Sequence, residues 1–137
     1  MKKYKAILVA LIIGITGFVV YDSFFKPWKE AEKRINKYMV EQGVSKDVID
    51  EITKSKAKKA TYKGILYKVS YKDDPGYVYE YLYSDNYYAL YGNKVWLQIY
   101  DVKKDNKLLR SNEELKNIKY PPIGLIKSDR NKNIEEN

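Results

Sequence analysis

Few side chains in this sequence are of the kinds that carry out acid–base or nucleophilic chemistry. Histidine and cysteine are both absent, which excludes disulfides, thiol nucleophiles, the usual zinc sites and any catalytic triad that depends on histidine. Ser55 to Lys58 matches the S-x-x-K element of penicillin-recognising serine enzymes, and Ser84 to Asn86 matches their S-D-N element. No K-T-G element follows, and the chain is too short for that larger fold. We therefore assign the match no function.

The acidic residues do not predict a metal site either. A calcium loop needs oxygen ligands at alternate positions around a central glycine, and neither 73–76 nor 101–107 has that spacing. Turn formation explains these aspartates better. Glu80 lies within an expected strand, where pairing with Ser70 or a diagonal lysine is favoured over a role as general acid. We expect no catalytic residue, no cofactor and no bound metal.

Tyrosine is the one residue type in excess, with 15 in the chain. Four of them alternate along one expected strand: Tyr77, Tyr79, Tyr81 and Tyr83. Such a row is a candidate protein-binding surface, or a platform on which sugars or bases stack. Tyrosine is also a strong strand former whose hydroxyl reaches water from a small core. Core packing is the favoured interpretation, followed by protein binding, and nucleic acid is not expected as a partner.

A run of lysines without any acidic residue extends from Thr53 to Lys63. Its members are Lys54, Lys56, Lys58, Lys59 and Lys63. The whole chain has a formal net charge of +8, so this run is a candidate contact for anionic lipid or an anionic wall polymer. A solvated connection before the first strand is the more ordinary interpretation.

The N-terminal segment predicts a membrane anchor. Three lysines, Lys2, Lys3 and Lys5, precede the uncharged run Ala6 to Val20, and residues 4–25 are long enough to cross a bilayer. A cleaved signal peptide is the alternative, although only Ile15 to Gly17 offers a cleavage site, and a poor one. Five basic residues within 26–37 rival the three before the run. We still expect the domain outside, because long domains translocate largely regardless of charge.

An amphipathic helix should follow the anchor. Proline is favoured in the first turn of a helix, so Pro27 marks its start, and Gly43 is the glycine expected just past its end. An apolar stripe runs along it at helical spacing: Trp28, Ala31, Ile35, Tyr38, Met39 and Gln42. Ser45 should then cap a second, short helix that points three apolar residues one way: Val48, Ile49 and Ile52.

Strands should follow, since the sequence period changes to two. We expect strands at 62–72, 77–84, 87–91 and 94–102, joined by polar turns as an antiparallel meander. A loop of residues 74–76 would create a ladder in which three pairs face each other: Tyr71 with Tyr79, Val69 with Tyr81, and Tyr67 with Tyr83. A capping box at 111–114 should start one further helical turn.

The expected fold class is α+β, with an amphipathic helix packed on a three- to four-stranded antiparallel sheet. Residues 1–25 would form the anchor, 26–126 one small domain, and 127–137 a disordered polar tail. Three segments resemble a family of small single-pass membrane proteins of Gram-positive bacteria. They are the basic start with its one apolar run, the helix end at 39–48 and the hairpin 67–81 around Asp73-Asp74-Pro75-Gly76. That family is known only as a domain of unknown function, the DUF3139 type. The resemblance, over residues 1–90, implies the anchor and the fold but no functional residue.

These features predict a single-pass protein of the cell membrane with an extracytoplasmic domain. We expect a non-catalytic accessory module that binds another membrane or envelope protein through its sheet. The alternative is an electrostatic module that binds anionic lipid or wall polymer through the Lys54 to Lys63 run, and an enzyme ranks third.

Overall fold

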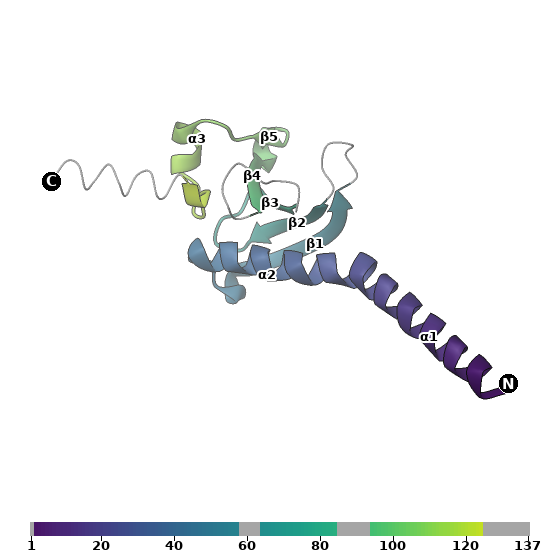
Figure 1. Ribbon diagram of the computed structural model, residues 1–137. Helices are drawn as coiled ribbons and strands as arrows, with labels where there is room; N and C mark the ends of the chain where they lie inside the picture. The colour runs from purple at the N-terminus through teal and green to yellow at the C-terminus, as the bar shows by residue number, and fades with distance from the viewer. Residues whose placement is uncertain (1, 58–63, 85–93, 125–137) are drawn as a thin grey trace.

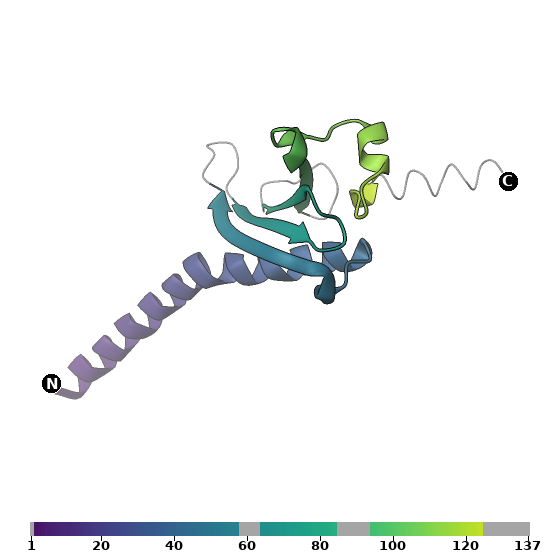
Figure 2. The ribbon, with the colours of Figure 1, turned by 180° about the vertical axis from the view of Figure 1, so that it is seen from behind.

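The computed structural model describes residues 2–57, 64–84 and 94–124. One long helix runs from the N-terminus into the domain, and an antiparallel sheet lies across its second half (Figures 1 and 2). A short C-terminal helix stands beside the sheet on the side away from the N-terminus (Figure 1). The α+β class expected from the sequence is confirmed.

The long helix consists of α1 (Lys2–Val20), the wider π-helical turn η1 (Tyr21–Phe25) and α2 (Lys26–Glu41). Pro27 lies in the first turn of α2, as predicted, but α2 is not a separate helix, because η1 joins it to α1. Proline has no N–H to donate and its ring crowds the preceding turn. In η1 the N–H of Lys26 donates to the carbonyl of Tyr21, and this wider turn carries the helix past the proline with a bend rather than a break (Figure 1).

The two halves of this helix have opposite surroundings. No residue of α1 is buried, and the helix is long and apolar enough to cross a membrane, a property that signal sequences share. The expected stripe is confirmed: Ala31, Ile35, Tyr38 and Met39 of α2 are buried, as is Gln42 at its C-cap, and Trp28 is half-buried. The same helix therefore supplies an uncovered apolar stem and one wall of the domain core.

Gly43 ends α2 as predicted, with a left-handed backbone (φ +83°). We expect Gly43→Ala to lower the free energy of unfolding by about 1 kcal/mol, because a Cβ is disfavoured at positive φ. Thermal unfolding of the full chain in detergent would measure this. Gly124→Ala, at a glycine whose added Cβ would meet nothing within 4 Å, is the control, and equal effects of the two changes would contradict the prediction.

Within the described residues the sheet has five strands in sequential order. They are β1 (Ile49–Ala57), β2 (Gly64–Tyr71), β3 (Tyr77–Tyr83), β4 (Val95–Asp101) and β5 (Lys107–Leu108). The expected count of three to four is thus too low, since β1 and β5 were both missed. The strand expected at 87–91 lies outside the described residues, and β3 pairs directly with β4.

Strand β1 replaces the short helix and the solvated connection that the sequence predicted. Only the turn Lys46–Val48 (η2) is helical there, and β1 then pairs along its length with β2. Seven of its nine residues, 50–56, are exposed in succession. An edge strand exposed on both faces needs no alternation of apolar and polar residues, so the usual sequence signal of a strand is missing.

The β2–β3 hairpin is shifted by two residues from the expected register. Val69 pairs with Tyr79, and Tyr67 pairs with Tyr81. The connection is longer than three residues, because Asp74 N–H donates to the carbonyl of Tyr71 and Gly76 takes a positive φ of 90°. Since side chains alternate with a period of two, a two-residue shift leaves every residue on its expected face.

The core lies between the inner face of the sheet, α2 and the segment 118–123, which we call the C-terminal strap. Three strap residues are buried: Ile118, Tyr120 and Ile123. Before the strap, the short turn Val102–Lys104 (η3) follows β4, and α3 (Asn112–Lys116) begins with the predicted capping box of Ser111 and Glu114. The strap therefore completes the tyrosine-lined core.

Candidate functional site

The four tyrosines predicted as protein-binding residues lie mainly inside the domain. Tyr79 and Tyr81 have no exposed surface and Tyr83 is 4 % exposed, whereas Tyr77 is half-buried. Tyr38 of α2 packs edge-on against Tyr81, with ring centroids 5.8 Å apart. Three of the four residues therefore serve core packing and do not form an exposed surface, which corrects the protein-binding hypothesis for them.

The tyrosine hydroxyls in this core belong to a hydrogen-bond network centred on Gln42. The Tyr81 hydroxyl donates to Gln42 Oε1 at 2.8 Å and lies 2.7 Å from the Tyr71 hydroxyl. Gln42 Nε2 donates to the carbonyls of Tyr120 (2.9 Å) and Pro121 (3.1 Å). Because buried polar groups are costly unless they are paired, this network favours one position of the strap on the helix and the sheet.

The paired aspartates of the hairpin turn hold the other side of the strap. The Tyr120 hydroxyl donates to Asp73 at 2.6 Å, and the Lys119 ammonium lies 2.7 Å from the same carboxylate. The Tyr79 hydroxyl donates to Asp74. Hydrogen bonds from Lys119 and then Tyr120 hold the pKa of Asp73 below its usual range. These aspartates therefore link the β2–β3 hairpin turn to the C-terminal strap.

Sequence reasoning missed the strap and the role of Gln42. The signal was present, because Ile118, Tyr120 and Ile123 flank Pro121-Pro122. It was not informative because the spacing fits neither a helix nor a strand.

Alkaline pH should unfold this domain. Burial raises the pKa of Tyr71 from 10.0 to about 12, and it raises the pKa of Tyr79 and Tyr81 in the same direction. Between the ordinary pKa of 10.0 and the raised pKa of about 12, the folded chain binds more protons than the unfolded chain. The buried tyrosines therefore contribute their full stability below pH 10, and this contribution falls as the pH rises towards 12. We expect the ionisation of the buried tyrosines, measured as the last part of the rise in tyrosinate absorbance, to coincide with the loss of near-ultraviolet circular dichroism. Complete ionisation of all tyrosines in a domain that stays folded would contradict this.

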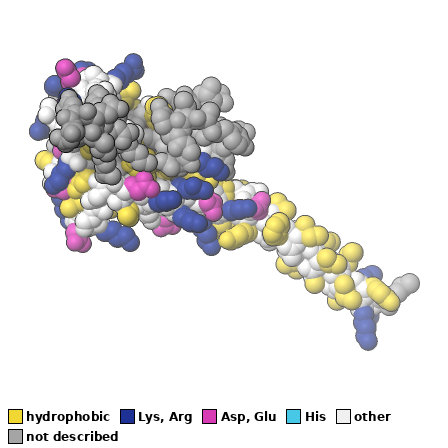
Figure 3. All heavy atoms as spheres, turned by 60° about the vertical axis from the view of Figure 1, so that its left-hand side comes forward, with side chains coloured by type: hydrophobic (Ala, Val, Ile, Leu, Met, Phe, Trp, Pro, Cys, Tyr) yellow, Lys and Arg dark blue, Asp and Glu magenta, His cyan; other side chains and the backbone are white. Residues whose placement is uncertain are grey.

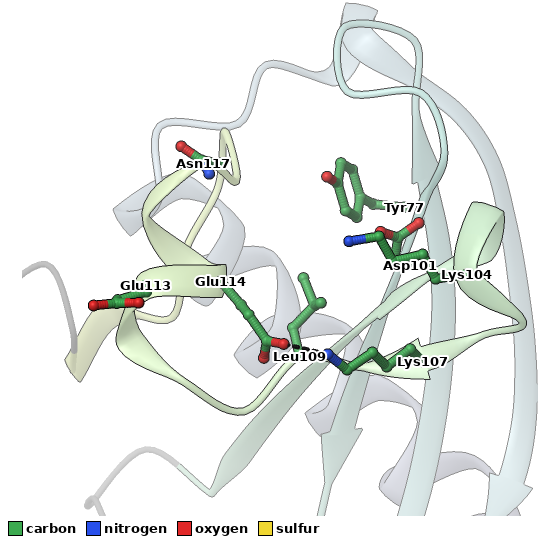
Figure 4. Close-up of a pocket in the computed structure, with 8 residues that line it drawn as sticks. All are labelled: Tyr77, Asp101, Lys104, Lys107, Leu109, Glu113, Glu114 and Asn117. Carbon is green, nitrogen blue, oxygen red and sulfur yellow. Dashed lines mark hydrogen bonds and ion pairs between the residues drawn. The ribbon is translucent and has the colours of Figure 1, made fainter.

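The structure also contains a surface hollow of about 270 Å³ between the end of the sheet and α3 (Figure 4). It is lined by Tyr77, Asp101, Lys104, Lys107, Leu109, Glu113, Glu114 and Asn117. The Lys107 ammonium pairs with the Glu114 carboxylate on one side of the hollow (Figure 4). This bond and the hydrogen bonds from the backbone N–H groups of Arg110 and Ser111 lower the pKa of Glu114 to about 2. Asp101 Oδ1 accepts from the Lys103 N–H at 3.0 Å. These charged groups stabilise the β4–β5 turn and α3.

Two members of the predicted lysine run lie on β1 and point towards aromatic rings. Lys54 Nζ lies 5.0 Å from the ring centroid of Tyr67, and Lys56 Nζ lies 5.1 Å from that of Phe24. The other three members, Lys58, Lys59 and Lys63, lie outside the described residues. Strand β1 therefore brings Lys56 to η1, the segment that joins the apolar stem to the domain.

Further charged and aromatic side chains gather at this segment. We call residues 21–29 together with Lys56 the junction. Lys29 Nζ lies 3.3 Å from the Tyr21 hydroxyl and 5.2 Å from its ring centroid, and Lys26 forms an exposed ion pair with Asp22 at 3.3 Å. Figure 3 shows basic side chains along α2 where the apolar stem meets the domain.

The remaining candidate residues have structural surroundings. Ser55 lies on the exposed strand β1, and Glu80 pairs with Lys68 directly opposite at 3.5 Å, rather than with Ser70 or a diagonal lysine. In the described part of the chain, no three acidic side chains are grouped so that they could hold a metal ion.

The chain thus combines a helix apolar enough to span a membrane with a small α+β domain built on the second half of that helix. A family model described as "Protein of unknown function (DUF3139)" matches residues 1–81, and the chain belongs to this family. The resemblance to the DUF3139 family is confirmed. No curated protein and no solved structure matches the chain.

Proposed function

We propose that this chain is a single-pass membrane protein whose basic domain lies outside the cytoplasm and acts as a non-catalytic accessory module. In this proposal it binds another membrane or envelope protein close to the bilayer. The observation that carries the proposal is the continuity of α1 with α2. Ala31 and Ile35 of that helix have no exposed surface, so the anchor and the domain core share one element, which limits the distance between the domain and the lipid.

The outer face of the sheet is the surface that we assign to partner binding. Leu66, Leu82 and Trp96 pair across β2, β3 and β4 in one row, on the face opposite the buried tyrosines. Leu66 and Leu82 are half-buried and Trp96 is 37 % exposed. A row of partly exposed apolar side chains beside polar residues is a candidate protein-binding surface.

Two measurements on intact cells test this proposal. External protease should remove the domain, and protection of the C-terminal region would overturn the orientation.

A photoreactive residue at Gln98, on the outer face, should give a crosslink to one partner. Leu82→Lys should abolish this crosslink without lowering the thermal stability. The same photoreactive residue at Lys116 is the matched control. Equal crosslinking from both positions would exclude the outer face as the binding surface.

A second candidate function is electrostatic binding of anionic lipid or wall polymer. It is favoured by Lys56, which the fold places 5.1 Å from the Phe24 ring at the end of the apolar stem. Replacing Lys54, Lys56, Lys58 and Lys59 by glutamine in the full chain should then weaken salt-sensitive binding to anionic surfaces. Unchanged binding would exclude this function.

A further inference from the structure

We infer that the junction binds the headgroups of anionic phospholipids. This inference rests on the proposed function in which α1 spans the membrane. It goes further because it commits to phospholipid headgroups as the ligand and assigns the contact to Lys29 and Lys56, two residues from different elements. The lysine run predicted from the sequence contains only one of them.

The first argument is the direction of the helix lysines. In a helix every Cα–Cβ bond tilts towards the N-terminus, which here is the side of the apolar stem. Lys29 follows this rule, because its ammonium reaches back to the Tyr21 hydroxyl at 3.3 Å, eight residues earlier. Lysines beside a membrane extend their ammonium groups to the headgroup level. Lys29 is therefore placed to meet headgroups at the end of the span.

The second argument is the position of Lys56. Its ammonium lies over the ring of Phe24, although the two residues are 32 positions apart in the sequence. Lys56 comes from the edge strand β1, which is exposed along most of its length. The folded domain thus brings a second cation to the same level of the stem as Tyr21 and Phe24.

The third argument is the aromatic content of this level. Tyr21 is 46 % exposed, Phe24 57 % and Phe25 58 %, and Tyr21 stacks on Phe25 with ring centroids 6.4 Å apart. Exposed aromatic rings at the end of an apolar helix are typical of the boundary between hydrocarbon and headgroups. Asp22 is the acidic residue at this level, and it pairs with Lys26. Lys29 and Lys56 contact aromatic rings. Because a ring does not neutralise an ammonium group, each lysine can still pair with a lipid phosphate.

These contacts favour lipid over a wall polymer as the ligand. The two cations lie against rings that adjoin the apolar stem, and a ligand that meets both groups must combine a phosphate with an apolar part. A phospholipid has both parts. A soluble polyanion would match only the lysines.

The full chain in phosphatidylcholine vesicles provides the test. Spin-labelled phosphatidylglycerol and spin-labelled phosphatidylcholine report how strongly each lipid associates with the protein. One lysine held at an anionic surface changes association by about fivefold. We expect Lys29→Gln/Lys56→Gln to lower the preference for phosphatidylglycerol by at least that factor, and high salt to lower it in the unchanged protein. Lys104→Gln/Lys116→Gln removes two exposed lysines of the β4–β5 turn and α3 and should leave the preference unchanged.

Three results would overturn the inference. The first is an equal preference in the junction variant and the control variant. The second is a loss with Lys29→Gln alone and none with Lys56→Gln, because the folded domain would then not contribute. The third is binding of soluble poly(glycerol phosphate) that abolishes the lipid preference. Alkaline extraction of the same vesicles separates the two proposals: an extracted chain refutes the membrane span, whereas an inserted chain without lipid preference refutes only this inference.

Discussion

Replacing Tyr81 by serine should unfold the domain. The Tyr81 ring has no exposed surface, and Tyr38 packs against it. Removing a buried aromatic ring costs about 3–5 kcal/mol, and leaving Gln42 Oε1 without its donor costs about 1–3 kcal/mol more. A small domain has only about 5–15 kcal/mol of total stability. We therefore expect near-ultraviolet circular dichroism of the full chain in detergent to lose its tyrosine signal.

Two milder changes make this prediction specific. Tyr81→Phe keeps the ring and removes the hydroxyl, so it should lower the free energy of unfolding by about 1–3 kcal/mol. Tyr100→Phe removes a hydroxyl bonded to Gln98 at 3.2 Å on the outer face, and should change the stability by less than about 0.5 kcal/mol. A stably folded Tyr81→Ser variant would contradict the buried position of Tyr81 and restore the binding-surface hypothesis for the tyrosine row.

Truncation after Asn117 should also prevent folding, although the family match ends at residue 81. The shortened chain lacks Ile118, Tyr120 and Ile123, each of which is less than 7 % exposed. Each large buried apolar side chain contributes about 1.5–3 kcal/mol. The truncation would also remove the acceptors of Gln42 and the Ile123 N–H that donates to the Tyr38 hydroxyl at 3.1 Å.

A chain ending at Gly124 is the matched control, because it keeps the whole strap. Limited proteolysis and thermal unfolding in detergent would compare the two chains. We expect the chain ending at Gly124 to unfold cooperatively, and the chain ending at Asn117 to be cleaved within β2 and β3 under conditions in which the longer chain resists. Equal resistance would show that the strap is not part of the folding unit.

If both predictions hold, the structural unit is larger than the part of the chain that the family model matches. The helix, β1, β2 and most of β3 lie within that match, whereas β4, α3 and the strap lie beyond it. A truncated version designed on the family boundary alone would expose Tyr79 and Tyr81. Studies of partner binding should therefore use the chain through at least Ile123.

Local patterns in the sequence were sufficient for much of the fold. The apolar run of α1, the stripe from Ala31 to Gln42, the alternation along β2 to β4 and the capping box at Ser111 each depend on neighbours a few residues apart. Such short-range spacing specifies which face of an element is apolar. It also placed every tyrosine of β3 on the correct face, even though the register of the hairpin was two residues off.

Tertiary structure alone decided which of these patterns meet. Strand β1 gains its ladder from β2 and carries no apolar alternation of its own, and the strap gains its position from Gln42, Asp73 and the tyrosine hydroxyls. The approach of Lys56 to Phe24 depends on contacts between distant segments, which no local spacing records. The sequence thus determined a membrane-type helix and an α+β domain with one tyrosine-lined face. Packing decided that this face is core and that Lys56 of β1 lies at the end of the stem.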